Sequence, residues 1–385
     1  MIYNRKVVFC AACAGMLLFG ICMITLGSVA SDLREKLHLN NIDSGTLFSI
    51  LPIGIIAGSF IFGPVVDKHG YKIFLVISSI CLFAGFEGLA FTRSTGMLKL
   101  FILLIGIGGG AINGATNALV SDISVKEKGA NISLLGVFYG LGALGMPLVL
   151  GLLKGRINYE MIVAVVGFIT FLSGVYFLVI KFPPPKQGRE VPFFQSLKLV
   201  KERVLLTIAV FLAFQSGFEG IINNWTTTYL VNRLEVTQNN ALFALSSFVG
   251  GMVIMRLLIG SIFRSYSSKK LLIISFILIL PGLILLNTAL SFNISVAGLV
   301  FLGAGLSGGF PIMLGFVGNL YSDLSGTAFS LVFFIALIGN ILINLLMGIV
   351  AQKFGIEHLI TFAMAESVIM MLLAVIIVKR TKNIG

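Results

Sequence analysis

The sequence predicts an all-α polytopic membrane protein with twelve transmembrane helices, organised as two pseudo-symmetric six-helix bundles. Of its 385 residues, 57% are hydrophobic and only 11% are charged, whereas soluble proteins carry about 25% charged residues. Long apolar runs recur from Val7 to Val378, so too few charges remain to cover the surface of a soluble fold. We therefore expect membrane-spanning segments along the whole chain.

Twelve segments are each long enough to cross a bilayer, because a hydrocarbon core of about 30 Å needs roughly 20 apolar residues in a helix. Lipid offers no hydrogen bonds to the backbone, so each segment should be helical. The predicted spans are 7–30, 44–66, 73–91, 97–120, 131–153, 160–181, 203–231, 241–263, 271–290, 294–320, 327–350 and 358–378.

The formal charge of +12 indicates the topology of the chain. With the N-terminus inside, eighteen Lys and Arg residues fall on the cytoplasmic side and eight on the outer side. The positive-inside rule then places both termini in the cytoplasm, and we expect a multi-pass protein of the bacterial inner membrane, surrounded by lipid. Nucleic acid is not an expected partner, because the basic residues lie in short loops. The apolar run after Lys6 is too long for a signal peptide, so the first helix should stay uncleaved.

One polar break, residues 182–202, is longer than the others and separates six spans from six. Three consecutive prolines, 183–185, end the sixth helix, and aromatic and basic residues within 193–201 suggest a short amphipathic helix at the inner surface. The predicted domains are an N-terminal six-helix bundle (1–181), a cytoplasmic linker (182–202) and a C-terminal six-helix bundle (203–385).

The two halves also carry matching residues at a constant offset. Each match is weak in a glycine-rich chain, but five matches in one register indicate an internal repeat. Two related six-helix halves are typical of secondary transporters, which bind substrate at mid-membrane where the repeats meet. The pairs, all 197 residues apart, are Gly129 with Gly326, Ser133 with Ser330, Leu134 with Leu331, Gly142 with Gly339 and Gly151 with Gly348.

The turn after the second span carries the pattern Gly63-x-x-x-Asp67-x-x-Gly70-x-Lys72. It resembles the signature between helices two and three of the major facilitator superfamily, although two positions depart from the family's basic residues. The resemblance implies a gating role for Gly63, Asp67, Gly70 and Lys72, with Asp67 and lysines forming a charge lock between helix ends that separate when the cytoplasmic gate opens. A turn with solvated charges is the structural alternative.

Two further segments resemble the fucose-permease and sodium-glucose branch of that superfamily, whose members are sugar–cation symporters. This resemblance implies a small-molecule solute, in the first place a sugar, with a proton or sodium as the coupling ion, no other cofactor, and a monomeric protein. Fucose permeases have carboxylates in helices one and four that are missing here, so coupling would fall to helix seven or use sodium. The segments are Gly106-x-Gly108-Gly-Gly110 with Asn117, and Gly217-x-Glu219 with Trp225-x-x-x-Tyr229.

Glu219 is the leading candidate for ion coupling. A charge near the membrane midplane costs roughly 2.5–3.5 kcal/mol and usually faces a cavity or a partner. Gln215, Glu219 and Asn223 are spaced by four residues and form one polar stripe. Arg256 lies at a similar depth in the antiparallel eighth span, where it can pair with Glu219, contact an acidic substrate or snorkel to the interface. Glu366 in the last span is a second coupling candidate, and a structural salt bridge is the alternative role for Glu219.

Neutral amides complete the predicted substrate site. Span four has an Asn pair on one face, and span eleven has another; amides suit sugar hydroxyls because they offer both donors and an acceptor. Interhelical hydrogen bonding is their alternative role. The only tryptophan can stack on a sugar or belong to the aromatic belt. The predicted substrate-binding residues are Asn113, Asn117, Gln215, Glu219, Asn223, Trp225, Asn340 and Asn344.

A proton-coupled exporter of hydrophobic compounds is the second function considered. The run from Gly136 to Gly151 in span five partly resembles the glycine–proline motif of drug exporters, but Met146 interrupts its Gly-Pro pair. Small residues there also permit close helix packing. An enzyme is not expected, because the three histidines lie near loops without a nucleophile or metal cluster and no Walker motif occurs. A transporter-like sensor that moves no solute is a third possibility.

Overall fold

A computed structural model describes residues 3–38, 41–153, 156–185, 199 and 201–381. Within these residues twelve helices are long and apolar enough to cross a membrane, and no strand is present. The predicted all-α, twelve-span class is therefore confirmed, and every predicted span overlaps one of these helices. The amphipathic helix predicted within the linker lies almost entirely outside the described residues.

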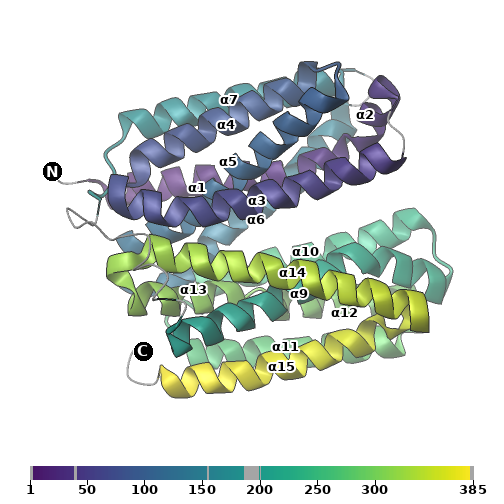
Figure 1. The fold of residues 1–385 in the computed structure, drawn as a ribbon. Helices are drawn as coiled ribbons and strands as arrows, with labels where there is room; N and C mark the ends of the chain where they lie inside the picture. The colour runs from purple at the N-terminus through teal and green to yellow at the C-terminus, as the bar shows by residue number, and fades with distance from the viewer. Residues whose placement is uncertain (1–2, 39–40, 154–155, 186–198, 200, 382–385) are drawn as a thin grey trace. The chain divides into compact units, whose positions relative to one another are not determined.

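The helices before the linker supply the first six spans. A short helix, α2, follows the first span, in the stretch between the predicted spans 7–30 and 44–66. These elements, shown in Figure 1, are α1 (Arg5–Ser28), α2 (Ala30–Leu37), α3 (Asn41–His69), α4 (Tyr71–Phe91), α5 (Thr95–Ile123), α6 (Lys128–Leu153) and α7 (Tyr159–Val179).

The helices after the linker supply the other six spans. The tenth span is interrupted at residues 307–308, although the sequence predicted one continuous helix over 294–320. The elements are α9 (Arg203–Leu234), α10 (Gln238–Gly260), α11 (Ser268–Thr288), α12 (Phe292–Leu306), α13 (Gly309–Leu320), η2 (Ser322–Leu324), α14 (Ser325–Phe354), η3 (Ile356–His358) and α15 (Leu359–Arg380).

The internal repeat is visible in where the helices begin. The starts of α3 and α10, of α4 and α11, of α5 and α12, and of α6 and α14 are each separated by 197 residues. This is the offset found from the five matching residue pairs. The repeat is therefore a repeat of structural elements as well as of sequence.

Glycines let these helices pack at backbone distance, as is usual between membrane helices. A Cβ atom on Gly54 of α3 would lie 2.7 Å from the carbonyl oxygen of Leu103 in α5, and a Cβ on Gly106 would lie 2.5 Å from the carbonyl oxygen of Leu51. Since a side chain at either position would push the two backbones apart, the α3–α5 packing depends on glycine.

The chain divides into two compact units. Unit 1 comprises residues 1–123, 138–196 and 323–330, and unit 2 comprises 124–137, 197–322 and 331–385. The first turns of α6, up to residue 137, belong to unit 2, whereas the rest of α6 belongs to unit 1. The first turns of α14, up to residue 330, belong to unit 1, whereas the rest of α14 belongs to unit 2. The predicted coupling residues Glu219, Arg256 and Glu366 lie in unit 2, and the predicted gating residues lie in unit 1.

Candidate solute and ion site

The polar stripe predicted on the seventh span is present on α9 and is held by hydrogen bonds. The Nε2 atom of Gln215 donates to Oε1 of Glu219 at 3.1 Å, and Nδ2 of Asn223 donates to the backbone oxygen of Glu219 at 2.7 Å. Gln215 is fully buried, Glu219 is half-buried and Asn223 is exposed. The carboxyl group of Glu219 therefore accepts a hydrogen bond from one fixed donor.

A second row of amides, on α14, extends this stripe within unit 2. Nδ2 of Asn340 donates to the backbone oxygen of Ser216 at 2.5 Å, which joins α14 to α9. Nδ2 of Asn344 donates to the Asn340 oxygens, and its own Oδ1 accepts a 2.9 Å hydrogen bond from Nδ2 of Asn224. We call the side chains of Gln215, Ser216, Glu219, Asn224, Asn340 and Asn344 the α9–α14 polar ladder. It brings together a carboxylate and several neutral amides, which can bind hydroxyl groups and a cation.

Gly220 gives the ladder its close packing, and its replacement yields a testable result. A Cβ atom there would lie 2.5 Å from Nδ2 of Asn344 and 2.7 Å from Nδ2 of Asn340, so both amides would have to move. Overpacking of this kind typically costs about 1–3 kcal/mol. We expect Gly220→Ala to weaken solute affinity at least about tenfold, as 1.4 kcal/mol corresponds to a factor of ten, in a binding titration of the purified protein.

Gly250→Ala is the matched control for that experiment. Gly250 lies in α10 of the same unit, and a Cβ atom there meets nothing within 4 Å. Solute affinity should therefore stay at the wild-type value. Equal affinities for wild type and Gly220→Ala would show that the amides of α14 do not contact the solute.

Arg256 is buried in α10, but it does not form the predicted close pair with Glu219. Its Nη1 donates to the backbone oxygen of Gly136 at 3.3 Å, and Oγ of Ser133 donates to the backbone oxygen of Arg256 at 2.9 Å. Among the described residues no carboxylate lies within ion-pair distance of its guanidinium, although Glu219 is within electrostatic range. The buried Nε of Arg256 has no hydrogen-bond partner among these residues. Arg256 thus ties α10 to the first turns of α6 and leaves one donor unused.

Glu366 is a buried carboxylate in α15, only 3% exposed. Neither of its oxygens has a hydrogen-bond partner in the described part of the chain. A buried charge without a partner is costly, so this group is more stable in its protonated form or with a cation. Its chemistry fits the coupling role predicted for it, but no hydrogen bond or ion pair among the described residues connects it to Glu219.

The remaining predicted binding residues are divided between the units. Asn117 is buried in α5 of unit 1, where its Nδ2 donates to both oxygens of Asn113. Trp225 is half-buried in α9, and its ring lies beside Gly348 of α14, 3.6 Å from where a Cβ on that glycine would be. The asparagine pair is therefore bonded within its own helix, and the tryptophan packs against a neighbouring helix.

The predicted gating residue Asp67 caps the start of α14, and this contact lies within unit 1. Its carboxylate accepts hydrogen bonds from the backbone N–H of Gly326 (3.2 Å) and from the N–H and hydroxyl of Thr327 (2.8 and 2.7 Å). The first N–H groups of a helix lack intrahelical partners, and the helix dipole favours an anion there. Asp67 is only 5% exposed, so this capping takes place away from water.

The two glycines of the same motif are each favoured for a different structural reason. A Cβ on Gly63 would lie 2.5 Å from the backbone oxygen of Gly326, so only glycine permits this approach of α3 to α14. Gly70 has φ +82°, a conformation that favours glycine. Lys72 is half-buried in the first turn of α4 and forms no ion pair with a described residue. The three hydrogen bonds described for Asp67 are thus with donors at the start of α14, and a charge lock with lysines stays a prediction.

The repeat places a basic residue at the position equivalent to Asp67. Arg264 lies 197 residues after Asp67 and, within unit 2, forms an ion pair with Glu127 and donates to Oδ1 of Asn131 at 2.8 Å. Lys128, the first residue of α6, donates to the backbone oxygen of Gly318 at 2.7 Å. The start of α6 is therefore held by cations, and the start of α14 by an anion. These partners could not be predicted from the sequence, since only the fold brings them together.

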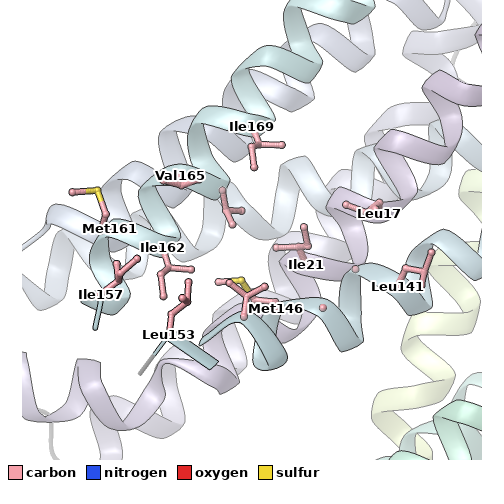
Figure 2. A pocket seen from close by; sticks show the side chains of 14 residues that line it. Leu17, Ile21, Leu141, Met146, Leu153, Ile157, Met161, Ile162, Val165 and Ile169 are labelled. Atoms are coloured by element: carbon pink, nitrogen blue, oxygen red, sulfur yellow. The ribbon is translucent and has the colours of Figure 1, made fainter. Parts of the chain in front are cut away.

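Unit 1 also contains an apolar pocket of about 490 Å³, beside α1, α6 and α7. Figure 2 shows its lining, in which aliphatic side chains and Met146 and Met161 surround the opening. Two glycines of the span-five run take part, and a Cβ on Gly145 would meet nothing within 4 Å. A pocket with such a lining suits a hydrocarbon group and not a polyhydroxylated solute.

The twelve long apolar helices of the described residues define the class of protein as a multi-pass membrane protein. The family model of the Major Facilitator Superfamily matches residues 9–321, most of the chain. The chain belongs to the Major Facilitator Superfamily.

Individual relatives are distant. The chain is 23% identical to a glucose/mannose transporter, GlcP, of Bacillus subtilis (strain 168) over 86% of this chain and 84% of that protein. It is 26% identical to a multi-drug resistance efflux pump PmrA homolog of Lactococcus lactis over 62% of each chain. Among solved structures, that of the E. coli fucose:proton symporter FucP matches with a TM-score of 0.80 and 16% identity, covering 97% of this chain and 99% of that one. This likeness shows the fold.

Proposed function

We propose that this protein is a secondary transporter that imports a small polar solute, in the first place a sugar, together with a proton or sodium ion. The observation that carries the proposal is the α9–α14 polar ladder, in which the Gln215–Glu219 pair lies on the same helix as the residues that bond to the row of amides on α14. The amides would bind the solute hydroxyls and Glu219 would take up the coupling ion. Coupling follows if ion and solute each strengthen the binding of the other.

The membrane location and the oligomeric state that we propose are those expected from the sequence. The protein would act as a monomer in the bacterial inner membrane, with both termini in the cytoplasm. The bundles formed by residues 1–181 and 203–385 would move relative to each other and open the site alternately to each side. The names of relatives agree with a sugar as the solute: one is a glucose/mannose transporter, and a structural neighbour is a fucose:proton symporter.

A second candidate function is the export of hydrophobic compounds in exchange for protons. The apolar pocket in unit 1 favours it, because its lining includes Gly142, Gly145 and Met146 of the run that resembles an exporter motif. One relative is named as a multi-drug efflux pump homolog. The amides of the polar ladder oppose this function, since a hydrophobic compound cannot satisfy them.

One deletion strain, with and without the cloned chain, distinguishes the two functions. We expect the chain to restore uptake of at least one radiolabelled hexose or pentose and to leave susceptibility to hydrophobic cationic drugs unchanged. A thermal-shift screen of sugars, with and without sodium and across pH, would first select the candidates. Increased drug resistance without sugar uptake would establish the exporter function instead.

A further inference from the structure

The apolar pocket of unit 1 begins just beyond a close crossing of α1 and α6. A Cβ atom on Gly142 would collide with the backbone oxygen of Leu17, and one on Gly20 would collide with that of Tyr139, so the two backbones touch there. About one turn further along α6, a Cβ on Gly145 would meet nothing within 4 Å. The glycine crossing is therefore followed by open space between α6 and α7, which is the pocket of about 490 Å³ seen in Figure 2.

One flank of the pocket is open to the surroundings of the protein. Met161, Val165 and Ile169 line it at four-residue intervals along α7 and are 59%, 51% and 46% exposed. The floor is closed, because Met146 of α6 and Ile162 of α7 are buried. An exposed apolar stripe on a membrane-spanning helix meets acyl chains, which are as apolar as the stripe itself. The pocket is therefore a groove that a lipid chain can enter from the side.

The length of this groove matches one leaflet of a bilayer. Its lining on α6 runs from Leu141 to Leu153, which is about 18 Å at a rise of 1.5 Å per residue. Half of a hydrocarbon core of about 30 Å is about 15 Å. An acyl chain that enters beside Leu153 can thus follow the groove to the middle of the bilayer, and it meets no polar side chain on the way.

A cation lies at the end of the groove where the chain turns from α6 to α7. Arg156 is exposed, and its backbone N–H donates to the backbone oxygen of Leu153 at 2.9 Å. The next residue, Ile157, donates to the same oxygen and lines the groove, as Leu153 does. Glu160 is 3.4 Å from Lys36, whereas Arg156 forms no ion pair with a described residue. The guanidinium is therefore available to an anion at the mouth of the groove, and guanidinium groups pair well with phosphate.

We propose that this groove binds one membrane phospholipid, with an acyl chain in the groove and the phosphate at Arg156. A neutral hydrophobic compound would leave the guanidinium unused, and a hydrophobic cation would be repelled by it. The lipid would come from the outer leaflet, because the topology expected from the sequence places the loop between α6 and α7 outside. The groove shares no residue with the polar ladder, so the inference does not depend on the solute or on the coupling ion.

Native mass spectrometry of the delipidated protein in detergent tests the proposal, with palmitoyl-oleoyl phosphatidylglycerol as the probe. We expect saturable binding of about one lipid per chain. Palmitoyl-oleoyl glycerol, which has the same chains and no phosphate, should bind about fivefold more weakly, since one basic residue near the membrane surface contributes a preference of about that size for an anionic lipid.

Two variants separate the acyl part of the site from the phosphate part. Gly145→Leu should weaken phosphatidylglycerol binding at least about tenfold, because its side chain would displace several methylenes, each worth about fourfold in affinity. Arg156→Gln should weaken phosphatidylglycerol binding about fivefold and leave palmitoyl-oleoyl glycerol binding unchanged. Should Gly145→Leu not fold, Arg156→Gln still decides.

Each variant has a matched control. Gly250 of α10 lies outside the groove, and a Cβ atom there also meets nothing within 4 Å, so Gly250→Leu should bind lipid like the wild type. Arg93 is an exposed arginine between α4 and α5 that forms no ion pair with a described residue. Arg93→Gln should leave the affinities for both lipids unchanged.

Three results would overturn the lipid site. The first is wild-type protein that binds phosphatidylglycerol no more tightly than palmitoyl-oleoyl glycerol, and the second is a folded Gly145→Leu variant with unchanged affinity. The third is displacement of the phospholipid by tetraphenylphosphonium, a hydrophobic cation, with binding of that cation lost in Gly145→Leu and strengthened in Arg156→Gln. That result would assign the pocket to the exporter function instead.

Discussion

Replacing Glu219 with glutamine is expected to abolish uphill solute uptake while solute exchange across the membrane survives. Glutamine keeps the size of the side chain and can still accept a hydrogen bond from Gln215, but it cannot carry the negative charge that binds a proton or attracts a cation. The accumulation ratio in vesicles should fall from the wild-type value to about one, because a transporter that has lost coupling only equilibrates its solute. Counterflow of labelled solute should continue.

Glu87→Gln is the matched control for this experiment. Glu87 is a half-buried carboxylate in α4 of unit 1, away from the polar ladder, so uphill uptake should be unchanged. Glu366→Gln tests the second coupling candidate in the same assay. Uphill uptake that survives in Glu219→Gln but is lost in Glu366→Gln would transfer the coupling role to α15.

Replacing Asp67 with alanine is expected to lower the free energy of unfolding by about 3 kcal/mol or more, since each of several buried donors left without a partner costs about 1–3 kcal/mol. Three donors of Gly326 and Thr327 would lose their acceptor at the start of α14. Asp67→Asn keeps one acceptor oxygen and should lie between alanine and wild type. The midpoints of thermal unfolding of the wild type and the two variants in detergent measure this order of stability.

Lys68→Ala provides the comparison, because Lys68 is an exposed neighbour in the last turn of α3. Surface substitutions of this kind usually change stability by no more than about 0.5 kcal/mol. Equal midpoints for Asp67→Ala and Lys68→Ala would show that the capping of α14 adds nothing to the stability of the fold.

The helices could be predicted from hydropathy because membrane spans obey a simple physical rule of length and apolarity. The stripe of Gln215, Glu219 and Asn223 followed in the same way from the helical period, and the repeat followed from residue matches that the helix starts now reproduce. Local pattern and local structure agree at these positions.

What could not be predicted depends on contacts between distant residues. Asp67 and Thr327 are 260 positions apart, so the motif indicated a charge but not its partner. Arg256 bonds to the backbone of Gly136, because the fold brings α6 there, and not to the carboxylate of Glu219. The break at residues 307–308 was missed because hydropathy averages over a span, although Pro311 after a glycine pair was the available signal.

Uptake of the selected sugar into proteoliposomes under an imposed ion gradient tests the proposed transport most directly. Wild-type protein should accumulate the sugar above its external concentration when sodium or proton is higher outside, and collapsing the gradient with an ionophore should release the accumulated sugar. Binding without flux would indicate a sensor, and equilibration that ignores both ion gradients would contradict coupled import.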